Sequence, residues 1–148
     1  MKAPIVTCGI YLYDANAKKI VVCHPTQASW NNWSIPKGLP DENEVLYTAA
    51  VRELYEETGI RLERIHIKTV HTLESKKYQK QNKILESFLV VTDTDLSTHP
   101  FVCSSKTEKG FPEVDKWKWV TLSEAIKMVH ETQQRNIAGI EAFLHSNA

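Results

Sequence analysis

The chain has 148 residues, of which 42% are hydrophobic and 24% charged, and its 18 Lys and Arg residues balance 18 Asp and Glu residues. This size and composition are typical of one globular domain, here residues 1–148, whose core is large enough to need no disulfide or structural metal. The zero net charge disfavours nucleic acid as a nonspecifically bound partner, but it leaves room for a small anionic ligand at a local cluster of basic residues.

The cysteines and the N-terminal residues help to predict the cellular compartment of the protein. Three cysteines without a Cys-x-x-Cys spacing predict reduced, packing thiols rather than a disulfide framework or a zinc site. Residues 1–13 lack the apolar core of a signal peptide, and no apolar run reaches the length of a membrane span. We therefore expect a cytoplasmic protein with no membrane contact, either a monomer or a homodimer.

Apolar periodicity predicts a mixture of strands and helices. In chain order we expect strands at 5–13 and 19–23, an irregular stretch at 24–43, a helix at 44–58, strands at 65–73 and 84–92, a strand at 116–120, and helices at 121–131 and 135–145. The first two pairs of strands are expected to form hairpins. Asp41-x-x-Glu44 and Thr121-x-x-Glu124 have the pattern of capping boxes. This order favours an α/β (α+β) fold with a mixed β-sheet between helices.

The helix at 44–58 carries three acids close together near its C-terminal end. Glu53, Glu56 and Glu57 have the i, i+3 and i+4 spacing, at which like charges destabilise a helix by about 0.3 kcal/mol per pair. The helix macrodipole also favours cations, not anions, at that end. Arg52 reaches Glu56 at i, i+4 but cannot neutralise three carboxylates. A solvated acidic face is the ordinary alternative, whereas a divalent cation such as Mg²⁺ or Mn²⁺ would compensate all three acids.

The residues around these acids form a longer motif. The segment reads Gly38-x5-Glu44-x7-Arg52-Glu53-Leu54-x-Glu56-Glu57-x-Gly59-Ile60, and it resembles the Nudix box at every fixed position. The chain is therefore identified as a member of the Nudix hydrolase family, and it is similar to the dinucleoside-polyphosphate and nucleoside-triphosphate pyrophosphohydrolases. Many members have glycine where this chain has Asn43. Asparagine tolerates the left-handed backbone conformation, so we expect the turn to be kept.

The resemblance implies a fold, a metal site and a reaction. The fold would be the Nudix fold, with Glu53, Glu56 and Glu57 as metal ligands, the carbonyl of Gly38 as a further ligand, and Arg52 orienting the carboxylates. Mg²⁺ or Mn²⁺ would lower the pKa of a bound water and neutralise the leaving group. A carboxylate would take the proton of that water. The implied activity is hydrolysis of a phosphoanhydride bond in a nucleoside diphosphate linked to another moiety.

Two acids outside this ligand set have open roles. For Glu44 two roles stay open, which are capping of the helix and support of the metal ligands. Nudix enzymes often use a further Glu from a loop before a tryptophan-bearing strand, and Glu113, six residues before Trp119, resembles it. We expect Glu113 to be a metal ligand rather than the base. Asp115 is its rival and Glu108 a more distant one, and the ordinary alternative is an ion pair between Glu113 and a nearby lysine.

Substrate contacts are expected outside the box. Lys37 lies next to the box, and Lys76 and Lys83 flank the loop between two predicted strands, where each could contact a phosphate. Tyr78 is placed similarly to a tyrosine of dinucleoside-polyphosphate hydrolases. The alternatives are solvated lysines and a packing aromatic ring. Other aromatic candidates for stacking on a base are Trp30, Trp33, Phe111 and Trp117.

The expected partner is a small-molecule nucleotide substrate. Dinucleoside polyphosphates rank first, nucleoside triphosphates second and nucleotide sugars third, and a capped RNA 5′ end gains no support from the net charge. The alternative function is a catalytically weak Nudix-fold module that senses a nucleotide. Such modules usually lose acids from the box, and this chain retains all of them.

Overall fold

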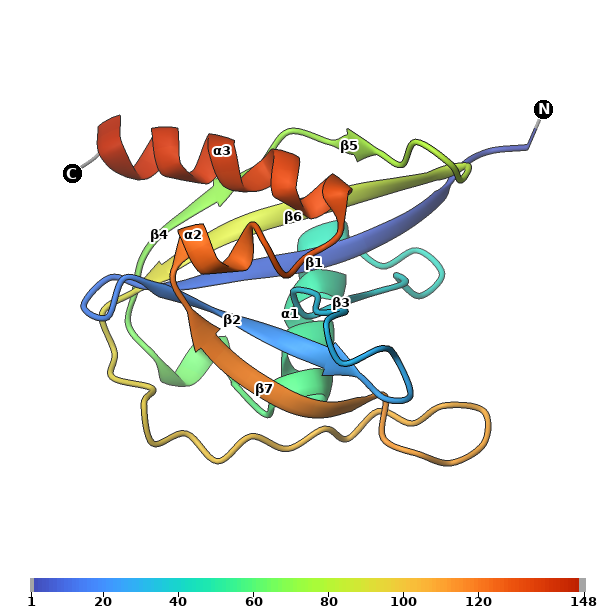
Figure 1. The fold of residues 1–148 in the computed structure, drawn as a ribbon, viewed down its shortest axis with the longest axis horizontal. Coiled ribbons are helices and arrows are strands. Elements are labelled where there is room, and N and C mark those ends of the chain that lie inside the picture. The colour runs from blue at the N-terminus through green and yellow to red at the C-terminus, as the bar shows by residue number, and fades with distance from the viewer. Residues whose placement is uncertain (1, 147–148) are drawn as a thin grey trace.

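The strands named below form one mixed sheet, and helices cover both of its faces (Figure 1). The structure is a computed structural model, and it describes residues 2–146. The elements are β1 (Ile5–Asp14), β2 (Lys19–Pro25), β3 (Lys37–Gly38), α1 (Leu46–Thr58), the 3-10 turn η1 (Leu62–Arg64), β4 (Ile67–Thr72), β5 (Lys76–Lys77), β6 (Lys83–Thr92), β7 (Val114–Val120), α2 (Leu122–Ala125) and α3 (Glu131–Ser146). The predicted α+β class with helices around a mixed sheet is confirmed.

The sheet is organised around β1 and β6, which run parallel over ten residue pairs, from Ile5↔Lys83 to Asp14↔Thr92. The strand order is β4-β6-β1-β2-β7, with β3 added to β1 and β5 added to β6. These other pairings are antiparallel. Both faces of the central strands are covered by helices, which explains their nearly continuous apolar sequences.

Successive side chains of β1 point to opposite faces of the sheet, and this divides the core into two clusters. Ile10 and Leu12 pack on one side with Leu54 of α1. Tyr11 packs on the other side with Ile137 of α3. Helix α1 lies behind the sheet in Figure 1, opposite α2 and α3. Its apolar stripe faces the sheet, so its acids lie at the margin of a buried cluster.

β1 changes its partner along its length, and this positions the loop before α1. Its N-terminal half pairs with β3, where Cys8 faces Gly38 and Gly9 faces Lys37. A side chain at position 9 would not fit, because a Cβ there would lie 2.8 Å from Cδ1 of Ile35. The two-residue strand β3 therefore holds the loop before α1 against the centre of the sheet.

Helix α1 begins at Leu46, two residues after the predicted start, and its N-cap Val45 offers no side-chain hydrogen bond. The Asp41 N–H does donate to Oε1 of Glu44 at 2.8 Å, but this half of the predicted capping box precedes the helix. Asn43 has the expected left-handed conformation, with φ 62°. The turn at Asn43 separates the box-like bond from the helix and delays the helix start.

The predicted helix at 121–131 is much shorter in the structure. The capping box of Thr121 and Glu124 is formed, but α2 ends at Ala125. The chain then turns, and the carbonyl of Met128 accepts a hydrogen bond from the Trp33 N–H at 3.3 Å. Past α2 the N–H groups of Lys127 and Met128 donate to carbonyls three residues back, so the chain tightens into a turn, and α3 starts at Glu131, four residues earlier than predicted. None of the helices within residues 2–146 is long and apolar enough to cross a membrane.

Candidate active site

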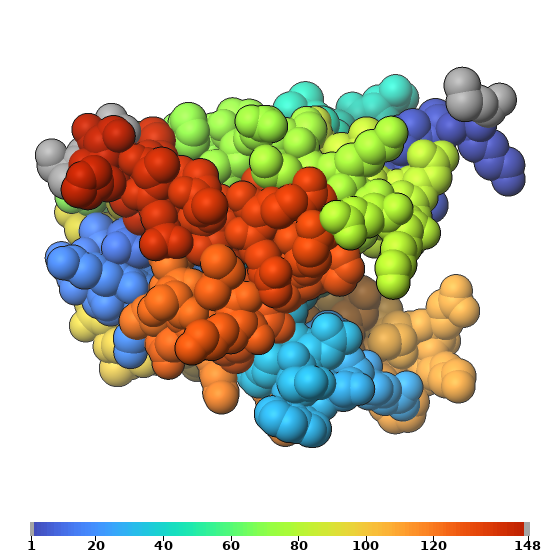
Figure 2. Space-filling view, turned by 45° about the horizontal axis from the view of Figure 1, so that its top comes forward, coloured from blue at the N-terminus to red at the C-terminus, as the bar shows by residue number. Residues whose placement is uncertain are grey.

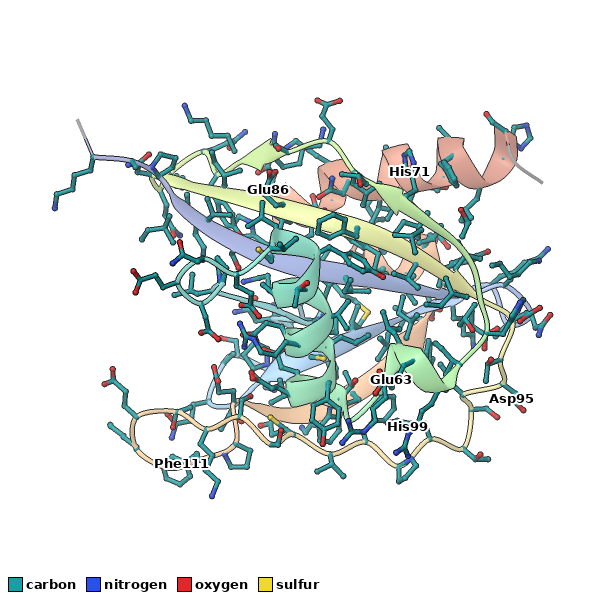
Figure 3. The ribbon with its side chains drawn as sticks, turned by 180° about the vertical axis from the view of Figure 1, so that it is seen from behind. Glu63, His71, Glu86, Asp95, His99 and Phe111 are labelled. Atoms are coloured by element: carbon teal, nitrogen blue, oxygen red, sulfur yellow. The ribbon has the colours of Figure 1, made fainter. Side chains whose placement is uncertain are left out.

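The C-terminal end of α1 is fixed by hydrogen bonds from β7 and from the segment between β6 and β7. Gly59 ends the helix in the left-handed conformation, with φ 79°. The carbonyl of Glu57 accepts a 2.7 Å hydrogen bond from Nε1 of Trp117, and the carbonyl of Glu56 accepts one from the N–H of Ser104 at 2.7 Å. Figure 3 shows this segment, with His99, passing the end of α1. These donors therefore bind free carbonyl groups at the end of α1 that carries the acids. Trp117 holds β7 against this end of the helix.

Arg52 joins the acids of the box to one another. Its Nη1 donates to Glu53 and to Glu56, in each case at 3.0 Å. Its Nε and Nη2 donate to Glu44 at 3.0 and 2.9 Å. The hydrogen bonds from Arg52 are the main reason that the pKa of Glu44 falls to about 2. Glu44 thus pairs with the orienting arginine instead of capping the helix, and no bond joins Arg52 to Glu57 among the described residues.

Glu53 and Glu57 are almost completely buried, with 9% and 8% of their surface exposed. Burial, followed by repulsion from Glu56, raises the pKa of Glu53 to about 7. Burial, followed by repulsion from Glu53, raises the pKa of Glu57 to about 8. Gly38 packs against the carboxylate of Glu53, which would overlap a side chain at position 38. Desolvation makes the charged forms of both acids costly unless a cation joins them.

The structure brings Glu113 to the same pocket as Glu57. The charge of Glu113 contributes to the raised pKa values of Glu53 and Glu57, behind burial and the closer acids. Its rival Asp115 has a different partner, because Oδ1 of Asp115 lies 2.6 Å from Nδ1 of His24. Among the described residues, no ion pair joins Glu113 to a lysine. This placement agrees with the expectation for Glu113 and leaves its role as a proposal.

A pocket of about 310 Å³ opens beside Glu57, at the lower end of the range for ligand sites. Four of the expected substrate contacts line it, namely Trp33, Lys37, Tyr78 and Lys83. Nζ of Lys83 lies 5.0 Å from the centre of the Tyr78 ring. Burial and the nearby charge of Lys83 lower the pKa of Lys37. Lys76 does not line this pocket, and its Nζ lies 3.6 Å from Glu74.

Several residues of the pocket were not found by sequence reasoning. They are polar groups from the loop after β2, the loop before β6 and the start of α3, namely Asn32, Gln81, His130 and Gln133. The ring of His130 lies 5.4 Å from that of Tyr78. These segments lie far apart in the sequence and share no motif, so no local pattern could have grouped them.

Comparison with known proteins decides the family. The family model for the NUDIX domain matches residues 3–140. The chain belongs to the NUDIX domain family. This confirms the identification made from the box, and it makes the chain a hydrolase of the class that acts on pyrophosphate bonds.

Relatives of this Nudix domain include proteins with several different ligands. An RNA pyrophosphohydrolase of Shewanella baltica is 27% identical over 131 residues, which cover 79% of this chain and 75% of the relative. An Ap4A hydrolase of C. elegans has a similar fold, with a TM-score of 0.72, 24% identity and coverage of 95% and 98%. The NUDIX domain of NrtR from Shewanella oneidensis, solved with ADP ribose, has a TM-score of 0.66, 17% identity and coverage of 97% and 90%.

Nudix domains generally use divalent metal ions such as Mg²⁺, and the donors on α1 fit such an ion in kind. They are carboxylate oxygens, which hard cations prefer, and Arg52 alone compensates Glu53 and Glu56 and does not bond to Glu57. Within residues 2–146, no three side chains are placed so that they could already hold a metal ion. Nη1 of Arg52 lies between Glu53 and Glu56, so a shared cation requires Glu56, whose side chain is 27% exposed, to turn away from Arg52.

Proposed function

We propose that this Nudix domain hydrolyses a phosphoanhydride bond of a nucleotide with Mg²⁺ or Mn²⁺ held by Glu53, Glu56, Glu57 and the Gly38 carbonyl. The observation that carries the proposal is the set of crowded carboxylates on α1, two of them buried, beside a pocket that also contains lysines. The metal, when bound, lowers the pKa of the attacking water and neutralises the phosphates.

Side chains of the site would bind the phosphates, accept the proton and position the acids. Lys37 and Lys83 present positive charge to the phosphate oxygens from the pocket wall. Glu57 and Glu113 are the carboxylates that line the pocket. Glu113 is the further metal ligand, and a carboxylate of the site takes the proton of the attacking water. Arg52 keeps the remaining acids in place. A phosphoanhydride has a stable leaving group, so the reaction needs no covalent enzyme intermediate.

The substrate we propose is a small nucleotide, and a dinucleoside polyphosphate ranks first. The Ap4A hydrolase relative and the place of Tyr78 in the pocket wall support this ranking. A second candidate is the 5′ end of an RNA chain, which the RNA pyrophosphohydrolase relatives favour. A nucleotide sensor remains the alternative function, and the NrtR domain with ADP ribose is its counterpart. The intact box disfavours a sensor.

A panel assay tests the proposed function. Purified protein with Mg²⁺ is incubated with a dinucleoside polyphosphate, a nucleoside triphosphate, a nucleotide sugar and a 5′-triphosphorylated RNA, and the products are separated. We expect hydrolysis of at least one compound, fastest for the dinucleoside polyphosphate, and loss of activity in excess chelator. Binding without hydrolysis under Mg²⁺ and under Mn²⁺ would support the sensor instead. Full activity in the chelator would contradict the metal site.

Exchanging Glu113 for glutamine tests its part in the reaction. Glu113→Gln removes a charge from the pocket without removing volume, and we expect kcat to fall at least about tenfold, which corresponds to ~1.4 kcal/mol of transition-state stabilisation. Thermal stability should hardly change, because Glu113 is exposed and its structural hydrogen bonds come from its backbone.

Asp115→Asn is the matched control for this change, since it lies two residues away and contacts His24 instead of the pocket. We expect its kcat to fall less than about threefold, an effect of less than ~0.7 kcal/mol. A severe loss in Asp115→Asn together with a nearly silent Glu113→Gln would show that the assignment is wrong.

A further inference from the structure

A second hollow shares Trp33 with the pocket of Glu57. It has a volume of about 670 Å³ and lies between the loop after β2, the strand β7 and the turn after α2. We call it the Trp30 groove, and define it by Trp30, Trp33, Lys116, Lys118 and Lys127. In Figure 2 the loop after β2, in light blue, lies beside the orange segment that contains α2.

The Trp30 groove is basic, although the chain as a whole is neutral. None of its lining residues is acidic. Lys116 and Lys118 are two residues apart on β7, so their side chains point to the same face of the sheet. Nζ of Lys118 lies 5.3 Å from the centre of the Trp33 ring. Among the described residues, none of the three lysines forms an ion pair. The charge of Lys118 acts on Glu124, where it helps to lower the pKa behind the hydrogen bonds from Thr121, but no carboxylate holds any of the three ammonium groups.

Trp30 presents an indole to the solvent from a loop that is held in place. The residue is 82% exposed, yet its carbonyl accepts a 3.0 Å hydrogen bond from Nε1 of Trp33. An exposed indole on an ordered backbone loses little conformational freedom when a flat ring stacks on it. Aromatic rings set among lysines are the usual platform for single-stranded nucleic acid, in which bases stack and phosphates pair with cations.

We propose that the Trp30 groove binds a single-stranded RNA chain whose 5′ end lies in the pocket of Glu57. The proposal rests on the proposed function, because the pocket would cut a phosphoanhydride at that 5′ end. A neutral second nucleoside would not need three lysines, whereas a run of phosphodiesters would. RNA begun without a primer carries a 5′-triphosphate and so offers such a bond, which a DNA strand does not.

Other roles explain only part of the groove. Lysines on an edge strand prevent pairing between molecules, and this accounts for Lys116 and Lys118 on β7, which is the last strand in the sheet order. It does not account for Trp30, or for Lys127, which lies outside the strands. A membrane surface also binds tryptophan and lysine, but it would meet them on a flat or convex face, and these side chains line a hollow.

The direct test uses RNA that cannot be hydrolysed by the proposed activity. A ten-nucleotide RNA with a 5′-hydroxyl and a 3′ fluorophore is titrated with the full chain in chelator, and fluorescence anisotropy is read at several salt concentrations. With three lysines engaged, we expect the logarithm of the binding constant to fall with the logarithm of salt with a slope of about −2. Lys116→Ala/Lys127→Ala should make the slope shallower by about 1.4, and Trp30→Ala should weaken binding about tenfold.

The control is Lys2→Ala/Lys68→Ala, which removes the same charge from exposed positions outside the groove. It should leave the salt slope within about 0.3 of the unchanged protein. No binding, or the same weakening by the control pair, would overturn the proposal. Binding to anionic phosphatidylserine vesicles through Trp30, without binding to RNA, would also overturn it.

A second measurement separates the groove from the catalytic proposal. Lys116→Ala/Lys127→Ala should raise KM about tenfold for 5′-triphosphorylated RNA, while KM for a small nucleotide stays unchanged, because neither lysine lines the pocket of Glu57. If the 5′-hydroxyl RNA binds but no compound is hydrolysed, the proposed function fails and the groove stands. If small nucleotides are hydrolysed but RNA does not bind, the groove proposal fails and the function stands.

Discussion

Replacing Glu57 by glutamine is expected to lower kcat by about 10²- to 10⁴-fold, the range for a positioned acid–base group. Glu57 lines the pocket and its carboxylate is buried. The carboxylate accepts a 3.4 Å hydrogen bond from the backbone N–H of Lys37. Glutamine keeps the size and this hydrogen bond but offers neither a charge to a metal nor a site for a proton. The rate would be measured with saturating Mg²⁺ on the best substrate of the panel.

The same variant has an expected effect on stability that runs in the opposite direction. The pKa of Glu57 is raised to about 8 by burial and then by Glu53, so the metal-free wild type binds an extra proton when folded. The stability that this proton contributes is therefore full below the unfolded pKa, near 4.3, and is lost as pH rises through about 8. Glutamine does not titrate, so the stability of Glu57→Gln lacks this dependence on pH.

Thermal denaturation without metal would measure this second effect. At pH 9 the Tm of Glu57→Gln should exceed that of the wild type by at least about 3 °C, and at pH 4 the two should agree. Glu63→Gln is the control, because Glu63 is exposed on η1 and lies away from the pocket. A variant with wild-type kcat, or one that is less stable at pH 9, would contradict the role of Glu57 as a buried, uncompensated acid.

The second large effect is expected for Arg52→Lys. A single ammonium cannot replace a guanidinium that donates to Glu44 on one side and to Glu53 and Glu56 on the other. We expect kcat to fall about 10- to 100-fold, because the ligand carboxylates lose their orientation. The free energy of unfolding should fall by about 1–2 kcal/mol.

A titration with Mg²⁺ distinguishes this positioning role from simple destabilisation. If Arg52 orients the ligands, the Mg²⁺ concentration for half-maximal activity should rise about tenfold in Arg52→Lys at a temperature where the variant is folded. Arg64→Lys is the matched control, because Arg64 is exposed on η1 and forms no side-chain ion pair among the described residues. An unchanged Mg²⁺ requirement would leave Arg52 with a purely structural role.

The part of the site that sequence could predict is the part encoded by local spacing. Glu53, Glu56 and Glu57 share one face because a helix has 3.6 residues per turn, and Asn43 and Gly59 mark turns that need a left-handed backbone. These features depend only on near neighbours along the chain. The same holds for the capping box that opens α2.

The features that sequence could not predict depend on contacts between distant segments. α2 stops early, and the turn that follows it bonds through the carbonyl of Met128 to the loop after β2. Gln81 and His130 line the same pocket as Lys37 because α3 packs against β5, which pairs with β6. Similarly, the partner of Asp115 is His24, a residue of the neighbouring strand. The apolar pattern of a strand is the same whichever strand lies next to it, so periodicity does not predict these pairings.

The parallel ladder of β1 and β6 has a consequence for synthesis of the protein. Its paired residues lie 78 positions apart along the chain, as in Ile5↔Lys83, and pairs this distant make folding slow. On a ribosome that adds about 5–20 residues per second, β1 waits several seconds before β6 leaves the exit tunnel. During that time β1 is without its main sheet partner. Ser104 and Trp117, which bond to the end of α1 that carries the acids, are made later still, so that end of the helix is completed only after more than half of the chain has been made.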